Sequence, residues 1–286
     1  VFGGTSSGKL ASKVAEMGSF DLGKTEIRKF PDGEFYIRIL SDVEDQDCVL
    51  IQTTRTSDDL IELFLLSDLL RDLNSSEIHT VIPYLAYSRQ DKVFKEGEAL
   101  SAKTILQLID KFSDSITTVN CHFFDFEGEF EFYGVRLKNL DAFPLLVEYF
   151  NGKLENPVII SPDKGALECG KKAAEIMKCE FDCLEKERVS DDKVIMTVGT
   201  LDISNRDVIL IDDMISTGGT ILEAARILRK EGADTISAGC VHGVFSYGTA
   251  ELSKILDNLV CTDTIQTEVS KVSIAPLIAE NLNREN

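Results

Sequence analysis

The sequence predicts an α/β protein built on mostly parallel sheets. Short β-branched runs alternate with amphipathic stretches along the 286 residues, a pattern typical of parallel strands joined by right-handed helical crossovers. Seven runs have the composition of core strands: VLIQ (49–52), HTVIP (79–83), SITTVN (115–120), PVIIS (157–161), DVILI (207–211), TISAGCV (235–241) and NLVCT (258–262). Because seven core strands at this spacing exceed one small sheet, we expect two α/β domains.

Three helices are predicted by apolar residues that recur at helical spacing. They cover residues 58–73, 100–112 and 219–230, and Gly232 ends the third of them. Each follows a predicted strand or precedes one, as the α/β class requires.

The domain boundary is predicted near residue 139. The stretch NGKLENP (151–157) has the composition of a surface turn, and residues 142–150 have the character of the second half. We therefore expect an N-terminal α/β domain over residues 1–139 and a C-terminal α/β domain over residues 140–286.

The bulk composition is that of an acidic globular protein. Hydrophobic residues make up 43% and charged residues 28%, and the formal net charge is −19. Such a surface repels nucleic acid and anionic membrane, so we expect neither as a partner; a polyanionic small molecule needs a locally basic pocket. Without an apolar run of membrane-spanning length or a signal pattern, a cytoplasmic location is expected.

The seven cysteines are scattered and form no C-x-x-C pair. Several lie inside apolar runs, and their number is odd. Buried free thiols in a reducing compartment are therefore favoured over disulfides or a zinc site.

Polar chemistry follows nearly every predicted strand. HTVIP leads into YLAYSRQDK, SITTVN into CHFF, PVIIS into PDKGA, DVILI into DDMISTGGT and NLVCT into DTI. Because ligands bind beyond the carboxyl ends of strands in open parallel sheets, this layout indicates an enzyme or a ligand-binding protein.

The stretch VILIDDMISTGGT (208–220) combines two acids with a glycine-rich turn. Glycines permit positive φ, and the N–H groups at the start of a helix surround a phosphate well. The acids Asp212 and Asp213 cannot face that phosphate, but carboxylates accept hydrogen bonds from a ribose diol and help to hold Mg²⁺. A sugar phosphate satisfies both ends of the stretch; a capped helix after a buried strand is the purely structural alternative.

This stretch resembles the phosphoribosyl-diphosphate loop of type I phosphoribosyltransferases. Four further segments resemble the ribose-phosphate pyrophosphokinase family, its archaeal-type members most of all: KFPDGEFYIRI (29–39), YSRQDKVFKEGEALSAK (87–103), SPDKGA (161–166) and EKERVSDD (185–192). The resemblance covers almost the whole chain, with the segments in the family's order. It implies two phosphoribosyltransferase type I-like domains, each a mostly parallel sheet flanked by helices.

The resemblance also implies the reaction. ATP and ribose 5-phosphate would give AMP and 5-phospho-α-D-ribosyl 1-diphosphate (PRPP), with Mg²⁺, in a homodimer or larger homo-oligomer. Asp212 and Asp213 would hold the ring hydroxyls. The 5-phosphate would be held by Ser216, Thr217, Gly218, Gly219 and Thr220. Bacterial and animal members usually have an acid where Ser216 stands, and serine is an equally good phosphate donor.

The resemblance assigns ATP to the first half. The implied ATP-binding residues are Phe30, Asp32, Glu34, Arg89, Gln90 and Asp91. By itself, a Phe before Pro-Asp-Gly is more often the flank of a turn. In the second half Lys186 and Arg188 match the family's catalytic loop, and cations there would stabilise the transferring group; without the family this segment indicates an exposed hairpin tip.

His122 and Asp163 match the family's Mg²⁺-associated positions. Imidazole is an unusual ligand for Mg²⁺, so chemistry alone favours a hydrogen-bonded histidine at a strand end. Many relatives have an acid two residues before this histidine, where this chain has Asn120. We interpret His79 and His242 as structural.

One further segment approaches a known nucleotide-binding motif. GGTSSGKL (3–10) approaches the P-loop pattern, but Leu10 replaces its Mg²⁺-binding hydroxyl residue, so we interpret it as the first strand–helix turn.

Two alternative functions stay open. A phosphoribosyltransferase that consumes PRPP would share the DDMISTGGT loop. A catalytically silent regulatory subunit of the same fold is the other alternative.

Overall fold

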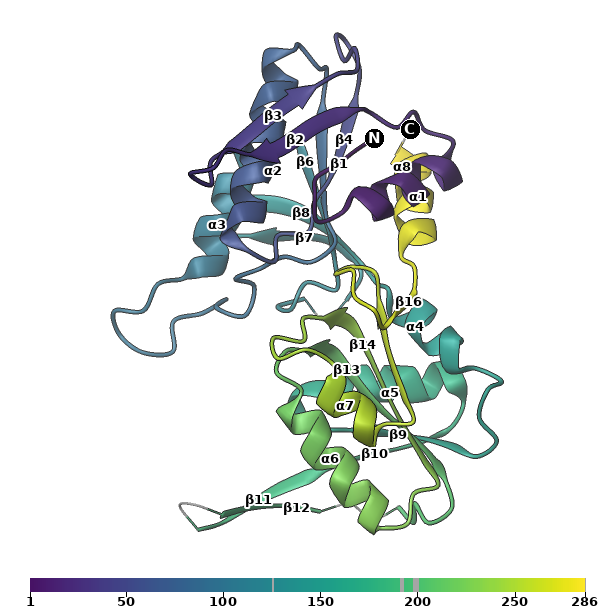
Figure 1. Ribbon diagram of the computed structural model, residues 1–286. Coiled ribbons are helices and arrows are strands. Elements are labelled where there is room, and N and C mark those ends of the chain that lie inside the picture. The colour runs from purple at the N-terminus through teal and green to yellow at the C-terminus, as the bar shows by residue number, and fades with distance from the viewer. Residues whose placement is uncertain (125, 191–192, 198–200, 286) are drawn as a thin grey trace. The chain divides into compact units, whose positions relative to one another are not determined.

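The computed structural model describes residues 1–124, 126–190, 193–197 and 201–285, without the side chains of 185–190, 193–197 and 285 (Figure 1). The chain divides into two compact units. The N-unit comprises Val1–Asp141, Thr264–Gln266 and Ser273–Asn286, and the C-unit comprises Ala142–Asp263 and Thr267–Val272. The sequence predicted one boundary, near residue 139. In the structure the chain passes from the N-unit to the C-unit after Asp141, and its C-terminal residues belong to the N-unit again.

The N-unit is a mostly parallel sheet with helices and one separate hairpin. Its elements are β1 (Phe2–Gly3), α1 (Gly8–Gly18), β2 (Thr25–Lys29), β3 (Phe35–Ile39), β4 (Cys48–Ile51), α2 (Ser57–Asp72), β5 (Ile78–Ile82), α3 (Ser101–Asp110), β6 (Ser115–Val119), β7 (Gly128–Phe132), β8 (Val135–Leu140) and α8 (Ala275–Glu285). The strand order is β1-β4-β5-β6-β8-β7, with only β7 antiparallel to its neighbour, and β2 pairs with β3 in an antiparallel hairpin.

The C-unit repeats this arrangement. Its elements are α4 (Phe143–Phe150), β9 (Pro157–Ser161), the 3₁₀ turn η1 (Lys164–Ala166), α5 (Leu167–Met177), β10 (Glu180–Cys183), β11 (Glu185–Ser190), β12 (Lys193–Thr197), β13 (Asp207–Ile215), α6 (Gly219–Lys230), β14 (Thr235–Gly243), α7 (Ala250–Ile255), β15 (Asn258–Thr262) and β16 (Ser270–Val272). The parallel order is β10-β9-β13-β14-β15-β16, and β11 pairs with β12 in an antiparallel hairpin.

The two units share one topology. The order β1-β4-β5-β6-β8 in the N-unit matches the order β9-β13-β14-β15-β16 in the C-unit. In each unit a hairpin outside the sheet lies between the first and the second strand of that series along the chain. All seven predicted strands and all three predicted helices are present, which confirms the α/β class with mostly parallel sheets. The repeat is invisible in the sequence because it lies in connectivity and packing rather than in identical residues.

Strands β13 and β14 are longer than the predicted DVILI and TISAGCV. They pair with each other beyond those runs, with Asp212 opposite Cys240, Met214 opposite His242 and Ile215 opposite Gly243. Backbone pairing between neighbours therefore extends each strand past the point where its apolar run ends. As a result both acids lie within a strand, where neighbouring strands hold their backbone.

Each unit has its own hydrophobic core. Helix α8 packs beside α1 (yellow and purple in Figure 1), and the Lys13 ammonium donates a hydrogen bond to Ser273 Oγ at 3.3 Å. All seven cysteines are free: Cys48, Cys121, Cys240 and Cys261 are buried, and Cys169, Cys179 and Cys183 are half-buried. No helix in the described part of the chain is both long and apolar enough to cross a membrane.

Candidate active site

Three carboxylates gather at the carboxyl ends of β9 and β13. Asp212 and Asp213 lie near the end of β13, and Asp163 follows the adjacent strand β9, where it caps η1 by accepting a hydrogen bond from the Gly165 amide at 2.9 Å. Asp212 also accepts a hydrogen bond from the amide of Asp213 at 2.9 Å. Parallel pairing therefore brings Asp163 to a pair of acids that lie 49 and 50 residues further along the chain.

The electrostatics of this cluster are unusual. The pKa of Asp212 is raised to about 8, mainly by burial and in addition by the nearby carboxylates of Asp213 and Asp163. A hydrogen bond between the Asp212 and Asp213 carboxyls acts in the same direction. Two carboxyls held this close disfavour the doubly ionised state, so the pair retains a proton more readily than an isolated carboxyl does. Such a pair suits hydroxyl donors or a divalent cation, either of which relieves the repulsion.

The turn after β13 has the geometry of a phosphate cradle. Gly218 has φ 82° and precedes α6, and its carbonyl accepts the Leu222 amide at 2.9 Å. The left-handed conformation favours glycine, and a Cβ here would lie 2.9 Å from Leu252 Cδ1. The N–H groups that begin α6 lack intrahelical partners, and the Gly219 amide makes a long contact of 3.5 Å to Thr217 Oγ1, so this helix start suits an anion.

The loop after β14 holds this turn in place. The Ser246 amide donates to the Ser216 carbonyl at 2.8 Å, and the Phe245 amide donates to the Ile215 carbonyl at 3.1 Å. His242 is buried within β14, consistent with the structural interpretation. These hydrogen bonds form because β13 and β14 are neighbours in the sheet. The sequence does not predict which strands are neighbours, so it does not predict these hydrogen bonds.

Hairpin β11–β12 carries the two predicted catalytic cations. Lys186 lies opposite Met196 and Arg188 opposite Val194 in its antiparallel register. The side chains of this hairpin and its turn lie outside the described residues. Residues 185–190 of the segment EKERVSDD therefore form one arm of a hairpin by their backbone, and the roles of Lys186 and Arg188 stay predictions.

In the N-unit, FPDGE forms the tip of hairpin β2–β3. The Phe30 amide donates to the Glu34 carbonyl at 2.8 Å, and Asp32 Oδ1 accepts the Glu34 amide at 3.3 Å. Gly33 has φ 95°, as this tight turn requires. Phe30, Asp32 and Glu34 are all exposed, so the hairpin presents the three predicted ATP-binding side chains to solvent.

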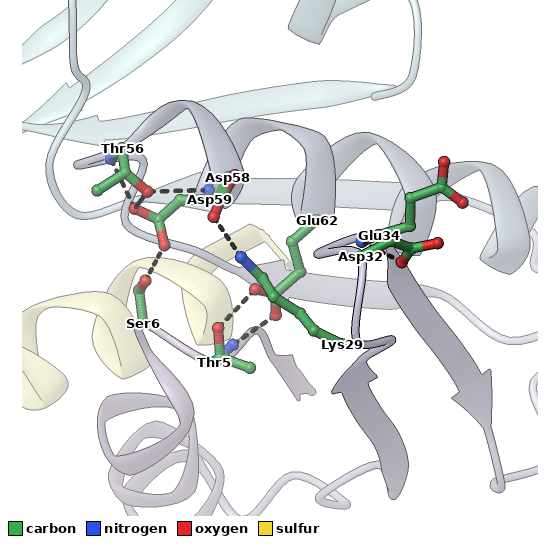
Figure 2. A network of polar contacts seen from close by, with 9 residues as sticks. All are labelled: Thr5, Ser6, Lys29, Asp32, Glu34, Thr56, Asp58, Asp59 and Glu62. Carbon is green, nitrogen blue, oxygen red and sulfur yellow. Dashed lines mark hydrogen bonds and ion pairs between the residues drawn. The ribbon is translucent and has the colours of Figure 1, made fainter.

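Both predicted ATP segments are tied to the first turn of α2. An ion pair joins Lys29, just before the hairpin tip, to Asp58 (Figure 2). In the other segment, the Tyr87 hydroxyl lies 3.2 Å from Ser57 Oγ. In Figure 2 the carboxylates of Asp32 and Glu34 point away from this network. Sequence reasoning missed Ser57 and Asp58, because their only local signal is that of a helix start.

The segment after β5 is a loop that hydrogen bonds within the loop stabilise. The Gln90 side chain donates to the Lys92 carbonyl at 3.2 Å, and the Glu98 carboxylate accepts the Phe94 and Lys95 amides at 3.0 and 2.9 Å. Arg89 is exposed, and Asp91 is half-buried. Gln90 therefore shapes the loop, while Arg89 is more open to a ligand.

The P-loop-like turn uses its donors inside the protein. The Thr5 amide donates to Glu62 Oε1 at 2.6 Å and the Thr5 hydroxyl to Oε2 at 2.5 Å, while Ser6 donates to Asp59 (Figure 2). Asp59 also closes the capping box of α2 with Thr56. Carboxylates thus occupy the place that a phosphate would need, which supports the interpretation as a strand–helix turn.

His122 follows β6 and is exposed in the N-unit, whereas Asp163 belongs to the C-unit. Among the described residues, no group of three or more His, Cys, Asp or Glu side chains has the arrangement of a metal site. Mg²⁺ needs fewer protein ligands, because substrate phosphates and water complete its coordination shell. The Asp163 carboxylate fits that ion; the His122 imidazole fits it poorly.

Comparison with known proteins agrees with these features. Residues 1–112 match the family model of the N-terminal domain of ribose phosphate pyrophosphokinase, and residues 144–275 match the phosphoribosyl transferase domain. The chain is 42% identical over 279 residues to ribose-phosphate pyrophosphokinase 2 of Archaeoglobus fulgidus, covering 97% of each chain. It is 41% identical over 286 residues to the ribose-phosphate pyrophosphokinase of Methanothermobacter thermautotrophicus, covering 98% of each.

A solved structure agrees as well. The phosphoribosylpyrophosphate synthetase of Mycobacterium smegmatis matches with a TM-score of 0.84 at 27% identity, covering 99% of this chain and 97% of that one. At 99% coverage the match includes residues of both units. With the acid pair, the glycine turn and these relatives in agreement, the chain belongs to the ribose-phosphate pyrophosphokinase family.

Proposed function

We propose that the protein transfers the diphosphoryl group of ATP to O1 of ribose 5-phosphate in a Mg²⁺-dependent reaction. The anomeric hydroxyl oxygen attacks the β-phosphorus and releases its proton to solvent, the bond between that phosphorus and the oxygen of AMP breaks, and PRPP and AMP leave. Diphosphoryl transfer needs positioning and charge neutralisation more than covalent chemistry by the protein. The residues with roles are therefore acids that hold hydroxyls, amides that hold phosphate, and cations.

The single observation that carries this proposal is the course of the chain from β13 to α6. Asp212 and Asp213 lie near the end of β13, and the turn at Gly218 leads into the start of α6, where backbone N–H groups can bind an anion. The acid pair binds the diol of the ribose, and the N–H groups and hydroxyls of residues 216–220 bind its 5-phosphate. The raised pKa of Asp212 supports this assignment, because hydroxyl donors satisfy a carboxyl pair that repels itself.

ATP is assigned to the exposed residues of the N-unit. Phe30 packs on the adenine, while Asp32 and Glu34 accept hydrogen bonds from the base or ribose. Arg89 contacts the phosphates, and Gln90 and Asp91 shape its loop. The common anchoring of both segments on α2 supports this assignment, since Ser57 and Asp58 hold them to one helix end.

Mg²⁺ supplies charge neutralisation on the diphosphoryl oxygens when bound. Asp163 would hold it as an oxygen ligand, and His122 would act near it rather than as a direct ligand. The acidic cluster around Asp212 gives a further reason for a cation in this part of the C-unit. Lys186 and Arg188 are assigned to the charge that develops on the transferring group.

The decisive experiment is a Mg²⁺-dependent assay with ATP and ribose 5-phosphate, with no nucleobase present. We expect AMP and an acid-labile pentose diphosphate in equal amounts. If neither forms while ribose 5-phosphate still binds, the proposal fails in favour of a silent subunit; turnover of PRPP with a nucleobase would instead indicate a phosphoribosyltransferase. Light scattering checks the expected homodimer or larger homo-oligomer.

A further inference from the structure

Hairpin β2–β3 has one face on the N-unit core and one face away from it. Ile27, Ile37 and Ile39 are partly buried against that core. Side chains alternate along a strand, so Arg28 and Tyr36, which lie directly opposite each other, belong to the other face. The Arg28 side chain is 51% exposed. The outer face therefore carries a cation beside an aromatic ring.

Arg28 contacts two rings at once. Its guanidinium carbon lies 4.9 Å from the centroid of the Phe30 ring and 4.2 Å from that of the Tyr36 ring. The two rings meet edge to face, with centroids 6.0 Å apart and an interplanar angle of 84°. A cation at these distances is attracted to both ring faces, so it holds the rings in one arrangement.

This arrangement has a consequence for Phe30. The residue is 40% exposed at the tip of the hairpin, where a ring without partners would sample several rotamers. The guanidinium lies over the ring, yet the residue keeps 40% of its surface exposed, so a planar ligand can reach it. A base that stacks on the exposed part of the ring then meets a ring whose orientation is already restricted, which lowers the entropy lost on binding.

We propose that Arg28 is a positioning residue that, together with Tyr36, holds the Phe30 ring for stacking on the base of the nucleotide substrate. This inference rests on the proposed role of Phe30 in ATP binding. Arg28 acts through the ring and not on the reacting phosphates. It sets the affinity for ATP and leaves the rate of the chemical step unchanged.

The test is steady-state kinetics of Arg28→Gln, with isothermal titration of Mg·ATP as a readout independent of turnover. Losing an exposed cation–π contact should raise the KM and the Kd for ATP roughly two- to fivefold. The kcat and the KM for ribose 5-phosphate should stay at the wild-type values. Arg28→Lys, which keeps a cation over the rings, should restore most of the affinity.

Arg38→Gln is the matched control. Arg38 lies on the same face of the same hairpin, opposite Glu26, and its loss removes the same charge. It should leave the KM for ATP near the wild-type value. An equal rise in both variants would overturn the inference, because general attraction of ATP to positive charge would then explain it. A fall in kcat, or a rise in the KM for ribose 5-phosphate, would indicate a structural role and overturn it too.

Phe30→Ala separates this inference from the proposed function. If Phe30→Ala leaves the affinity for ATP unchanged, the proposed role of Phe30 fails, and the inference fails with it. If Phe30→Ala weakens ATP binding and Arg28→Gln does not, only the inference fails. In the Phe30→Ala background, Arg28→Gln should cause no further loss; an undiminished effect there would mean that Arg28 contacts the nucleotide directly.

Discussion

Replacing Gly218 by alanine should destabilise the C-unit and weaken the binding of ribose 5-phosphate. The residue has φ 82°, which costs an L-residue about 1–2 kcal/mol. The added Cβ would also lie 2.9 Å from Leu252 Cδ1, in a side chain that is buried in the C-unit core. Overpacking of this kind costs about 1–3 kcal/mol, so we expect a total loss of about 2–5 kcal/mol.

Gly219→Ala is the matched control one residue along the chain. Its Cβ would meet only Thr217 Oγ1, at an ordinary 3.8 Å, and the residue begins α6. Alanine is a better helix former than glycine, so this variant should be neutral or up to about 1 kcal/mol more stable than the wild type. The pair therefore separates the geometry of Gly218 from the mere loss of a glycine.

Urea unfolding of the two variants measures the difference in unfolding free energy, and steady-state kinetics measure the KM for ribose 5-phosphate. Gly218→Ala should raise that KM and leave the KM for ATP nearly unchanged, because only the C-unit turn is distorted. Combining it with Leu252→Ala should show coupling of about 1–3 kcal/mol, since the crowding disappears. Equal stability of Gly218→Ala and Gly219→Ala would refute the reasoning.

Three further predictions test the site and a buried acid of the N-unit. Lys186→Ala should lower kcat about 100-fold or more and leave both KM values nearly intact, since the cation acts on the transition state; a change in KM alone would contradict that role. Asp163→Asn should raise the Mg²⁺ concentration for half-activation several-fold in a metal titration, whereas His122→Asn should shift it little; the reverse order would count against the oxygen-ligand assignment. Burial raises the pKa of Glu62, and the hydrogen bonds from Thr5 offset this only in part. The folded chain therefore keeps a proton that the unfolded chain releases, so the unfolding free energy of the wild type should fall, relative to Glu62→Gln, as pH rises through the folded pKa. Urea unfolding of both proteins at pH 5 and pH 8 checks this, and parallel pH profiles would show the carboxyl to be unperturbed.

Several properties of this protein can be predicted from the sequence alone because they depend on neighbouring residues. The periodicity of apolar residues predicts the core strands and the helices α2, α3 and α6. The contiguous stretch from Val208 to Thr220 contains a strand, two acids, a glycine turn and a helix start, so its chemistry is legible without a structure. Pro31, Asp32 and Gly33 predict a turn for the same reason.

Only the tertiary structure decided which distant groups meet. The approach of Asp163 to Asp212 depends on β9 pairing with β13, and the lengths of β13 and β14 depend on each other. The hydrogen bonds of Thr5 to Glu62 span 57 residues and turn an apparent phosphate loop into an internal contact. Pairing partners and packed faces are chosen among elements far apart in the chain, where local propensity carries no information. The sequence therefore determined the chemistry that each segment offers, and the fold decided where that chemistry is combined.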